Sequence, residues 1–233
     1  MGTVRQVIRA PLRIAQELFA PLGSGYERWA RILSMGQDLR WRRKMVAGLG
    51  IGSGSPALDI AAGTGSITRL LQEAGASVIS LDQSLQMLGH AVERGATGVV
   101  ATAEALPFPD AGFDVVTFGY LFRYVHDVEG CMREVARVLG SGGHLGMVEF
   151  GRPRGLWRPL WWGYTRIVLP ALGLIAGDGW YRVGRFLGPS IDEFVDRYPR
   201  SRLIAIWKEV GFTEVRTARL SLGGGLVMWG TKR

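Results

Sequence analysis

The segment LDIAAGTG, residues 58–65, contains an acidic residue, Asp59, shortly before a glycine-containing turn. The apolar residues before the turn predict a short buried strand, and the residues after it predict a helix. Glycines such as Gly63 and Gly65 let the backbone approach a ligand closely and adopt dihedral angles that a Cβ atom disfavours. Asp59, near the end of the strand, offers a carboxylate to an amino group, reached through a water molecule. We therefore predict a small-molecule site at this turn.

A second carboxylate, Asp82, follows Gly63 by 19 residues and ends the next expected strand. In nucleotide-binding sheets, an acidic residue at this place hydrogen-bonds the ribose hydroxyls. Ligands of such sheets lie beyond the carboxyl ends of the strands. The sequence therefore predicts that Asp82 and the glycine turn share one ligand.

The type of ligand follows from what the turn lacks. A dinucleotide needs GxGxxG to seat its pyrophosphate, but Ala61 holds the first glycine position, and Ile67 and Thr68 stand where the third would come. Asp59 would also repel a pyrophosphate, whereas it suits the amino group and the sulfonium of S-adenosylmethionine. We predict S-adenosylmethionine as the cofactor. The residues that carry this prediction are Asp59, Ala61, Gly63, Gly65 and Asp82.

The elements that position these residues alternate between strands and helices. Expected strands cover residues 57–61, 78–81, 98–101, 113–118 and 145–150. Between the last two, apolar residues at helical spacing predict a helix over residues 128–139, with Asp127 as its N-cap. This alternation predicts a mostly parallel sheet with helices on both faces. Two further strand candidates, residues 214–220 and 226–229, predict an antiparallel hairpin at the edge of the sheet.

Length and composition indicate how the chain is organised. With 233 residues, it suits one α/β domain with an attached cap. We expect a basic helical cap at residues 1–54, then the main domain at residues 55–233, with a lid-like insertion at about residues 152–200. Cys131 is the one cysteine, so a disulfide framework and a cysteine-rich metal site are excluded, and no metal is expected. A reducing, cytoplasmic compartment fits.

The net charge of +8 and the pI near 10.2 bear on partners rather than on fold. The longest apolar run, residues 167–177, is shorter than the ~20 residues of a spanning helix, although it could lie on a bilayer. The segment before it is rich in aromatic and basic residues. Their side chains could pack within a cap, form a lid over the substrate or contact anionic lipids. These residues are Arg152, Arg154, Trp157, Arg158, Trp161, Trp162, Tyr164 and Arg166. An amphipathic stretch at residues 4–19 could close over the cofactor or touch a membrane.

Three further motifs resemble the ubiquinone/menaquinone biosynthesis C-methyltransferase family. The segment AEALPFPDAGFD, residues 103–114, is similar to the run that follows the third strand in many class I methyltransferases. Residues 137–150, RVLGSGGHLGMVEF, resemble one family signature, and residues 26–34, followed by Trp41 and Arg42, resemble another. The resemblance covers most of the chain from about Phe19. It implies a Rossmann-like, seven-stranded fold and methyl transfer to a ring carbon of a prenylated hydroquinone such as demethylmenaquinol.

The resemblance also carries site residues over to this sequence. Thr64, Asp82, Thr102 and Ala103 match cofactor contacts, although the family often has Asp or Asn where Thr102 stands. Arg123 matches an arginine that is proposed to help deprotonate the quinol. The full set of residues expected at the cofactor is Asp59, Ala61, Gly63, Thr64, Gly65, Asp82, Gln83, Met87, Thr102, Ala103, Glu104 and Gly119.

At the acceptor, a neighbouring hydroxyl must lose its proton before a ring carbon becomes nucleophilic. Since arginine is almost always protonated, we favour Arg123 as an electrostatic stabiliser of the phenolate. His126 is the more ordinary base candidate. Tyr26, Tyr124 and Trp162 are expected to bind the hydrophobic acceptor. Tyr124 replaces the usual Asn after the arginine, and Asp38 stands where the first signature has His; both departures lie on the acceptor side.

Other functions remain as alternatives. The acceptor could be another lipid or small molecule, as in phospholipid N-methylation, or the chain could be a cofactor-binding module without turnover. A nucleic-acid methyltransferase is not expected, because residues 118–121 read FGYL where amino-methylating enzymes carry an Asn/Asp-Pro-Pro-aromatic motif. The sequence does not give the oligomeric state. An anionic membrane surface, on the inner face of the membrane, is a possible partner.

Overall fold

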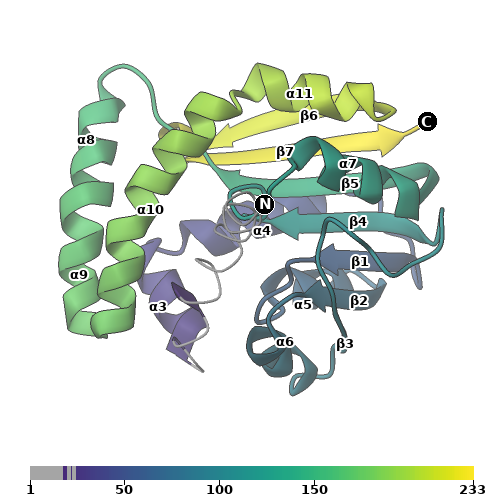
Figure 1. Ribbon diagram of the computed structural model, residues 1–233, viewed down its shortest axis with the longest axis horizontal. Coiled ribbons are helices and arrows are strands. Elements are labelled where there is room, and N and C mark those ends of the chain that lie inside the picture. Colours follow the sequence, from purple (N-terminus) through teal and green to yellow (C-terminus); the bar gives the residue numbers. More distant parts are fainter. Residues whose placement is uncertain (1–17, 20–21, 23–24) are drawn as a thin grey trace, which may run out of the picture.

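Seven strands form a single mixed sheet in the computed structural model, which describes residues 18, 19, 22 and 25–233 (Figure 1). The strand order is β3-β2-β1-β4-β5-β7-β6. The strands are β1 (Pro56–Ile60), β2 (Ser77–Asp82), β3 (Thr97–Val100), β4 (Phe113–Gly119), β5 (Leu139–Phe150), β6 (Phe212–Leu220) and β7 (Gly225–Lys232). Neighbouring strands from β3 to β5 in this order are parallel, whereas β7 runs antiparallel to both β5 and β6. The predicted Rossmann-like architecture and its edge hairpin are confirmed.

Apolar residues bury both faces of this sheet. On one face, α7 (Val128–Val138) and α11 (Arg200–Glu209) enclose a core with Trp207 and Phe118. On the other, α4 (Gln37–Ala47) packs Trp41 and Met45 against β5 and β7, and α5 (Ser66–Glu73) covers β1, β2 and β4. The helix α6 (Leu85–Val92) covers β2 and β3. The helix α7 begins as predicted, because the Asp127 carboxylate accepts a hydrogen bond of 2.8 Å from the N–H of Gly130.

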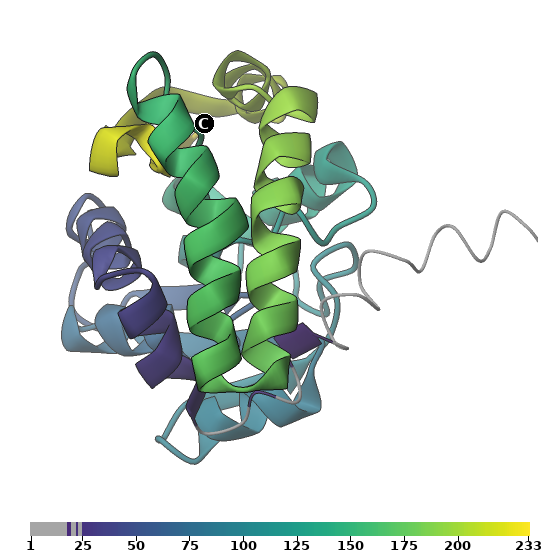
Figure 2. The same cartoon turned by 90° about the vertical axis from the view of Figure 1, so that its left-hand side faces the viewer.

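The expected insertion consists of two antiparallel helical rods (Figure 2). The first joins α8 (Trp157–Gly163), the π-helical turn η2 (Tyr164–Val168) and α9 (Leu169–Ala176), and the second is α10 (Asp178–Arg197). They touch closely because glycines face the partner backbone. A Cβ atom on Gly173 would lie 2.6 Å from the carbonyl oxygen of Trp180, and one on Gly184 would lie 2.9 Å from Leu169.

These rods stand beside the carboxyl ends of the parallel strands, and α3 (Tyr26–Leu33) leans against them (Figures 1 and 2). Leu33 of α3 packs with Leu169, Trp180 and Val183. The space between the rods, α3 and the strand ends is therefore enclosed on several sides. Most of the expected N-terminal amphipathic stretch, residues 4–19, lies outside the described residues. None of the helices in the described part of the chain is long and apolar enough to span a membrane.

Candidate functional site

A cavity of about 760 Å³ opens at the carboxyl ends of the strands. Ala61, Gly63, Asp82 and Gly119 line it from the sheet. Side chains from α3, α4 and the two helical rods line it from the opposite side. The cavity therefore joins the predicted cofactor turn to the expected insertion.

The turn between β1 and α5 exposes its backbone to this cavity. Ala61, Gly63 and Gly65 all have positive φ angles, of 55°, 56° and 83°. Asp82 braces the turn: one carboxylate oxygen accepts the N–H of Gly63 at 2.8 Å, and the other accepts the N–H of Ser84 at the same distance. Burial raises the pKa of this carboxyl, although the backbone donors oppose the shift. Each oxygen keeps a lone pair for a ligand hydroxyl.

Asp59 lies behind the turn instead of in the cavity wall. Its side chain is fully buried and accepts hydrogen bonds from the hydroxyls of Thr68 at 2.8 Å and Thr117 at 2.9 Å. Because Thr68 lies on α5, its hydrogen bond places the Asp59 side chain on the face of β1 that α5 covers. The expectation that it reaches a cofactor amino group therefore lacks a direct contact, and the structure gives it a role within the core.

The buried carboxyl of Asp59 makes the stability of the protein depend on pH. Burial raises its pKa from the usual 3.8 to about 6, against the lowering effect of the two threonines. Between about pH 4 and 6 the folded protein holds a proton that the unfolded chain has lost, so the free energy of unfolding falls as pH rises, by about 3 kcal/mol from this group. We expect Asp59→Asn to remove that part of the decline in urea titrations across this window. Parallel pH curves for the two proteins would contradict it.

Most of the other residues expected at the cofactor do line the cavity. They are Thr64, Gln83, Met87, Ala103, Glu104 and Gly119. Two do not: Gly65 packs against Ala91 of α6, and Thr102 is exposed and bridges to Ala105. Sequence position alone placed both beside lining residues and could not give the direction in which each one faces.

An unforeseen contact ties α3 to the turn. Glu27 accepts a hydrogen bond of 2.9 Å from the hydroxyl of Thr64, and Arg94 pairs with the same carboxylate. Ser66 also donates to it, at 3.3 Å. The segment around α3 is thereby held over the cofactor end of the cavity.

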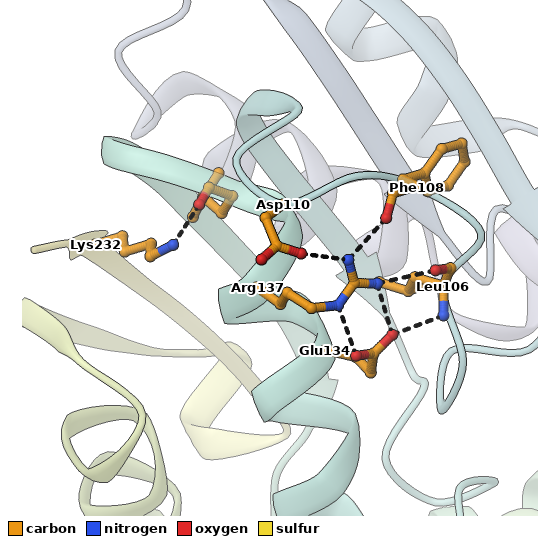
Figure 3. Close-up of polar contacts among 7 residues, drawn as sticks. Leu106, Phe108, Asp110, Glu134, Arg137 and Lys232 are labelled. Carbon is orange, nitrogen blue, oxygen red and sulfur yellow. Dashed lines mark hydrogen bonds and ion pairs between the residues drawn. The ribbon is translucent and has the colours of Figure 1, made fainter.

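Arg137 of α7 binds the loop that follows β3, at residues 106–110 (Figure 3). Its guanidinium donates to the carbonyl oxygens of Leu106 and Phe108, at 2.9 and 2.7 Å, and to Asp110. Glu134 pairs with the same guanidinium and accepts the N–H of Leu106. Arg137 therefore pairs two carbonyl groups of the loop that follows β3 and holds that loop against α7.

At the acceptor end, Arg123 lines the cavity and forms a buried ion pair with Glu149. The Nε–Oε1 distance is 3.1 Å, and the two side chains are 3% and 1% exposed. The guanidinium lies 5.0 Å from the ring centre of Tyr124 and 5.2 Å from that of Phe150. Burial opposes its charge, but Tyr124 and Glu149 together raise the pKa of Arg123. The group keeps its proton, so it can stabilise a negative oxygen and cannot itself accept a proton.

Tyr26 and Tyr124 also line the cavity, and their role in binding the acceptor stays a prediction. Two other expectations need correction. His126 is exposed and outside the cavity, and only its backbone N–H is used, in a bond to Glu104. Trp162 is 56% exposed and points away, whereas Trp161 and Trp157 line the cavity, because the phase of α8 turns them inward.

A polar cluster that the sequence did not connect completes the site. Asp38 of α4 accepts hydrogen bonds from Arg42 and from the hydroxyl of Tyr120, which follows β4. All three line the cavity. Asp38 and Tyr120 are 82 residues apart, so only the fold brings them together. In contrast, the sequence does point to a buried ion pair at Glu149, because a charged residue within an apolar strand usually has a buried partner.

Comparison with known proteins extends these observations. The model of the ubiE/COQ5 methyltransferase family matches residues 9–232. A demethylmenaquinone methyltransferase of Tropheryma whipplei is 34% identical, and the match covers 89% of this chain and 87% of the relative. One of Thermus thermophilus is 37% identical, over 76% and 84%. The ubiquinone/menaquinone biosynthesis C-methyltransferase UbiE of Desulfotalea psychrophila is 34% identical, over 93% and 89%.

The fold is shared with solved methyltransferase structures. A SAM-dependent methyltransferase of Thermotoga maritima, described as a possible histamine N-methyltransferase, matches with a TM-score of 0.63 at 20% identity, over 93% of this chain and 99% of that one. This likeness agrees with the seven-stranded sheet described above. The chain is an S-adenosylmethionine-dependent methyltransferase and belongs to the ubiE/COQ5 methyltransferase family.

Proposed function

We propose that this enzyme methylates a ring carbon of a prenylated hydroquinone of the demethylmenaquinol type. The observation that carries the proposal is the second half of the cavity, where aromatic walls surround a buried guanidinium. Tyr26, Trp161 and Trp180 provide the apolar surface, and Arg123 provides the charge. An apolar chamber with a few fixed polar groups suits a ring that carries two hydroxyls and a prenyl chain. The names of the three relatives described above support the same acceptor.

The residues at the other end fit S-adenosylmethionine. Asp82 retains lone pairs that suit ribose hydroxyls, Met87 and Ala103 offer an apolar wall for the adenine, and Gly63 presents backbone without a Cβ. The cofactor, when bound, supplies an activated methyl group on its sulfonium. The protein then has to hold the acceptor ring in line with that group and to exclude water. Arg123 would stabilise the negative charge that develops on the acceptor oxygen.

Methyl transfer from labelled S-adenosylmethionine tests this function. The purified protein would be offered demethylmenaquinol with a short prenyl chain and, separately, phosphatidylethanolamine. We expect label in the quinol and none in the phospholipid. Label in the phospholipid would move the assignment to lipid N-methylation, and cofactor binding without transfer to either acceptor would contradict the proposal.

We further propose that the rod formed by α8, η2 and α9 rests on an anionic membrane surface. It carries a run of exposed apolar side chains, with Arg154 and Arg158 exposed at its start. They are Leu156, Trp157, Leu160, Trp162, Ile167, Val168, Leu172, Leu174 and Ile175. Trp157 and Leu160 also line the cavity, so a prenyl chain could pass from lipid to the site without crossing water. Arg152 and Arg166 pair with Asp192 instead.

Sedimentation with vesicles of phosphatidylglycerol and phosphatidylcholine tests this surface. Leu156 and Ile175 are 90% and 76% exposed and do not line the cavity. Replacing both by serine should lower the partition coefficient roughly tenfold or more, because each apolar side chain contributes over 1 kcal/mol when buried. The matched control is Leu85→Ser on α6, where the side chain is 72% exposed. Equal binding of all three proteins would contradict the proposed orientation.

A further inference from the structure

Deprotonation of a phenolic acceptor needs a base, and the cavity limits the choice. Among the described residues that line it, three carry carboxylates: Asp38, Asp82 and Glu104. Asp82 accepts two backbone N–H groups at the cofactor turn, and Glu104 accepts those of His126 and Asp127. Both are thus engaged at the cofactor side. Asp38 is the carboxylate that remains at the acceptor side.

The surroundings hold Asp38 in one orientation. Arg42, one helical turn later, donates from Nε to both carboxylate oxygens, at 2.9 and 3.0 Å. The hydroxyl of Tyr120 donates to Oδ1. The Tyr120 ring stacks on Phe150 with centres 4.5 Å apart, and Arg42 covers it at 5.2 Å. The side chain of Asp38 is still 20% exposed, on the cavity.

Tyr120 itself sits in an unusual backbone conformation. Its φ of 58° is in the left-handed region, which disfavours a bulky side chain. The hydrogen bond from its N–H to the carbonyl oxygen of Val148 helps to hold this conformation. Residues held in such conformations cluster at functional sites. Here the conformation aims the phenol of Tyr120 at Asp38.

We propose that Asp38 is the general base that takes the hydroxyl proton from the acceptor, an inference that rests on the proposed quinol methylation. The O–H bond breaks, its proton goes to Oδ2 of Asp38, and its electron pair makes the adjacent ring carbon nucleophilic. That carbon forms the new bond to the methyl group, whose old bond leaves with its electrons on sulfur. The ring carbon then loses its own proton to solvent, and Asp38 returns its proton to the oxygen. One proton is released per methyl transferred.

Neighbouring groups do not compete for this role. Burial, with Asp38 alongside, raises the pKa of Tyr120 well above its usual value, so Tyr120 donates to the carboxylate and keeps its proton. Burial opposes the charge of Arg42, but Asp38 raises its pKa. Tyr26 faces the cluster from α3, and burial raises its pKa to about 12. On the far side of Tyr120, Arg123 keeps its proton and is paired with Glu149, so neither group is a competing base.

The test compares Asp38→Asn with the wild-type enzyme on short-chain demethylmenaquinol. Loss of a general base should lower kcat by about 10²–10⁴-fold, with the calorimetric affinity for S-adenosylmethionine unchanged. Between pH 7 and 9, kcat of the variant should rise roughly tenfold per pH unit, because ionisation of the phenol itself, with a pKa of about 10, replaces the base. Asp38→Glu should keep a wild-type pH profile. The matched control is Asp114→Asn, at an exposed position on β4 outside the cavity.

Three results would overturn the proposal, and they differ from one another. Normal kcat in Asp38→Asn would leave quinol methylation intact and remove Asp38 as the base. Equal loss in the Asn and Glu variants, with an unchanged pH slope, would assign Asp38 a structural role beside Arg42. A wild-type enzyme that binds the cofactor and methylates no quinol would refute the proposed function, and this inference with it.

Discussion

Methionine in place of Arg123 is expected to lower the free energy of unfolding by about 3–5 kcal/mol, because it leaves the Glu149 carboxylate buried without its partner. The two side chains are nearly inaccessible and lie 3.1 Å apart. Burial already raises the pKa of Glu149, and Arg123 is the main group that opposes this shift. Urea unfolding at pH 7 measures the effect. Activity should fall as well, since the charge that faces the acceptor is lost.

A second variant separates stability from chemistry. Arg123→Met combined with Glu149→Leu replaces the pair by apolar side chains and should recover most of the stability, while activity stays low. The control is Arg69→Met, because the Arg69–Glu73 pair is 52% and 61% exposed and such pairs contribute about 0–1 kcal/mol. A single Arg123→Met variant as stable as the wild type would show that the buried pair does not hold the fold. An active double variant would show that Arg123 is not needed for transfer.

Asparagine in place of Asp82 is expected to weaken binding of S-adenosylmethionine by roughly 10- to 100-fold. Both carboxylate oxygens accept backbone N–H groups, from Gly63 and Ser84. An asparagine amide turns one acceptor into a donor that faces another donor, and hydrogen bonds to charged groups contribute about 1.5–3 kcal/mol. Isothermal calorimetry gives the affinity, with Asp114→Asn as the exposed control. An unchanged dissociation constant would exclude Asp82 from the cofactor site.

The elements of this fold could be predicted because their signals are local. Alternating apolar runs gave all seven strands, and a glycine turn gave the end of β1. Boundaries were less predictable where one element runs directly into the next. The strand β5 begins at Leu139, immediately after α7, instead of at the expected residue 145. Residues 139–144, which form the start of β5, include three glycines and show no apolar pattern from which a strand could be inferred.

The site was harder to predict than the fold, because direction and long-range contact decide it. Asp59 and Asp82 both stand near strand ends, yet only the latter lies at the tip, where it reaches the cavity. Trp161 and Trp162 are adjacent, and the rotation of α8 decides which one faces inward. The contact between Asp38 and Tyr120 depends on α4 packing across the sheet, which no local pattern encodes.

The position of the transferred methyl group tests most directly whether the enzyme methylates a ring carbon. The enzyme would be incubated with trideuteromethyl S-adenosylmethionine and short-chain demethylmenaquinol, and the product examined by mass spectrometry and NMR. We expect a CD₃ group on the ring carbon. A CD₃ group on a hydroxyl oxygen, or an unlabelled quinol recovered from an enzyme that binds the cofactor, would contradict it.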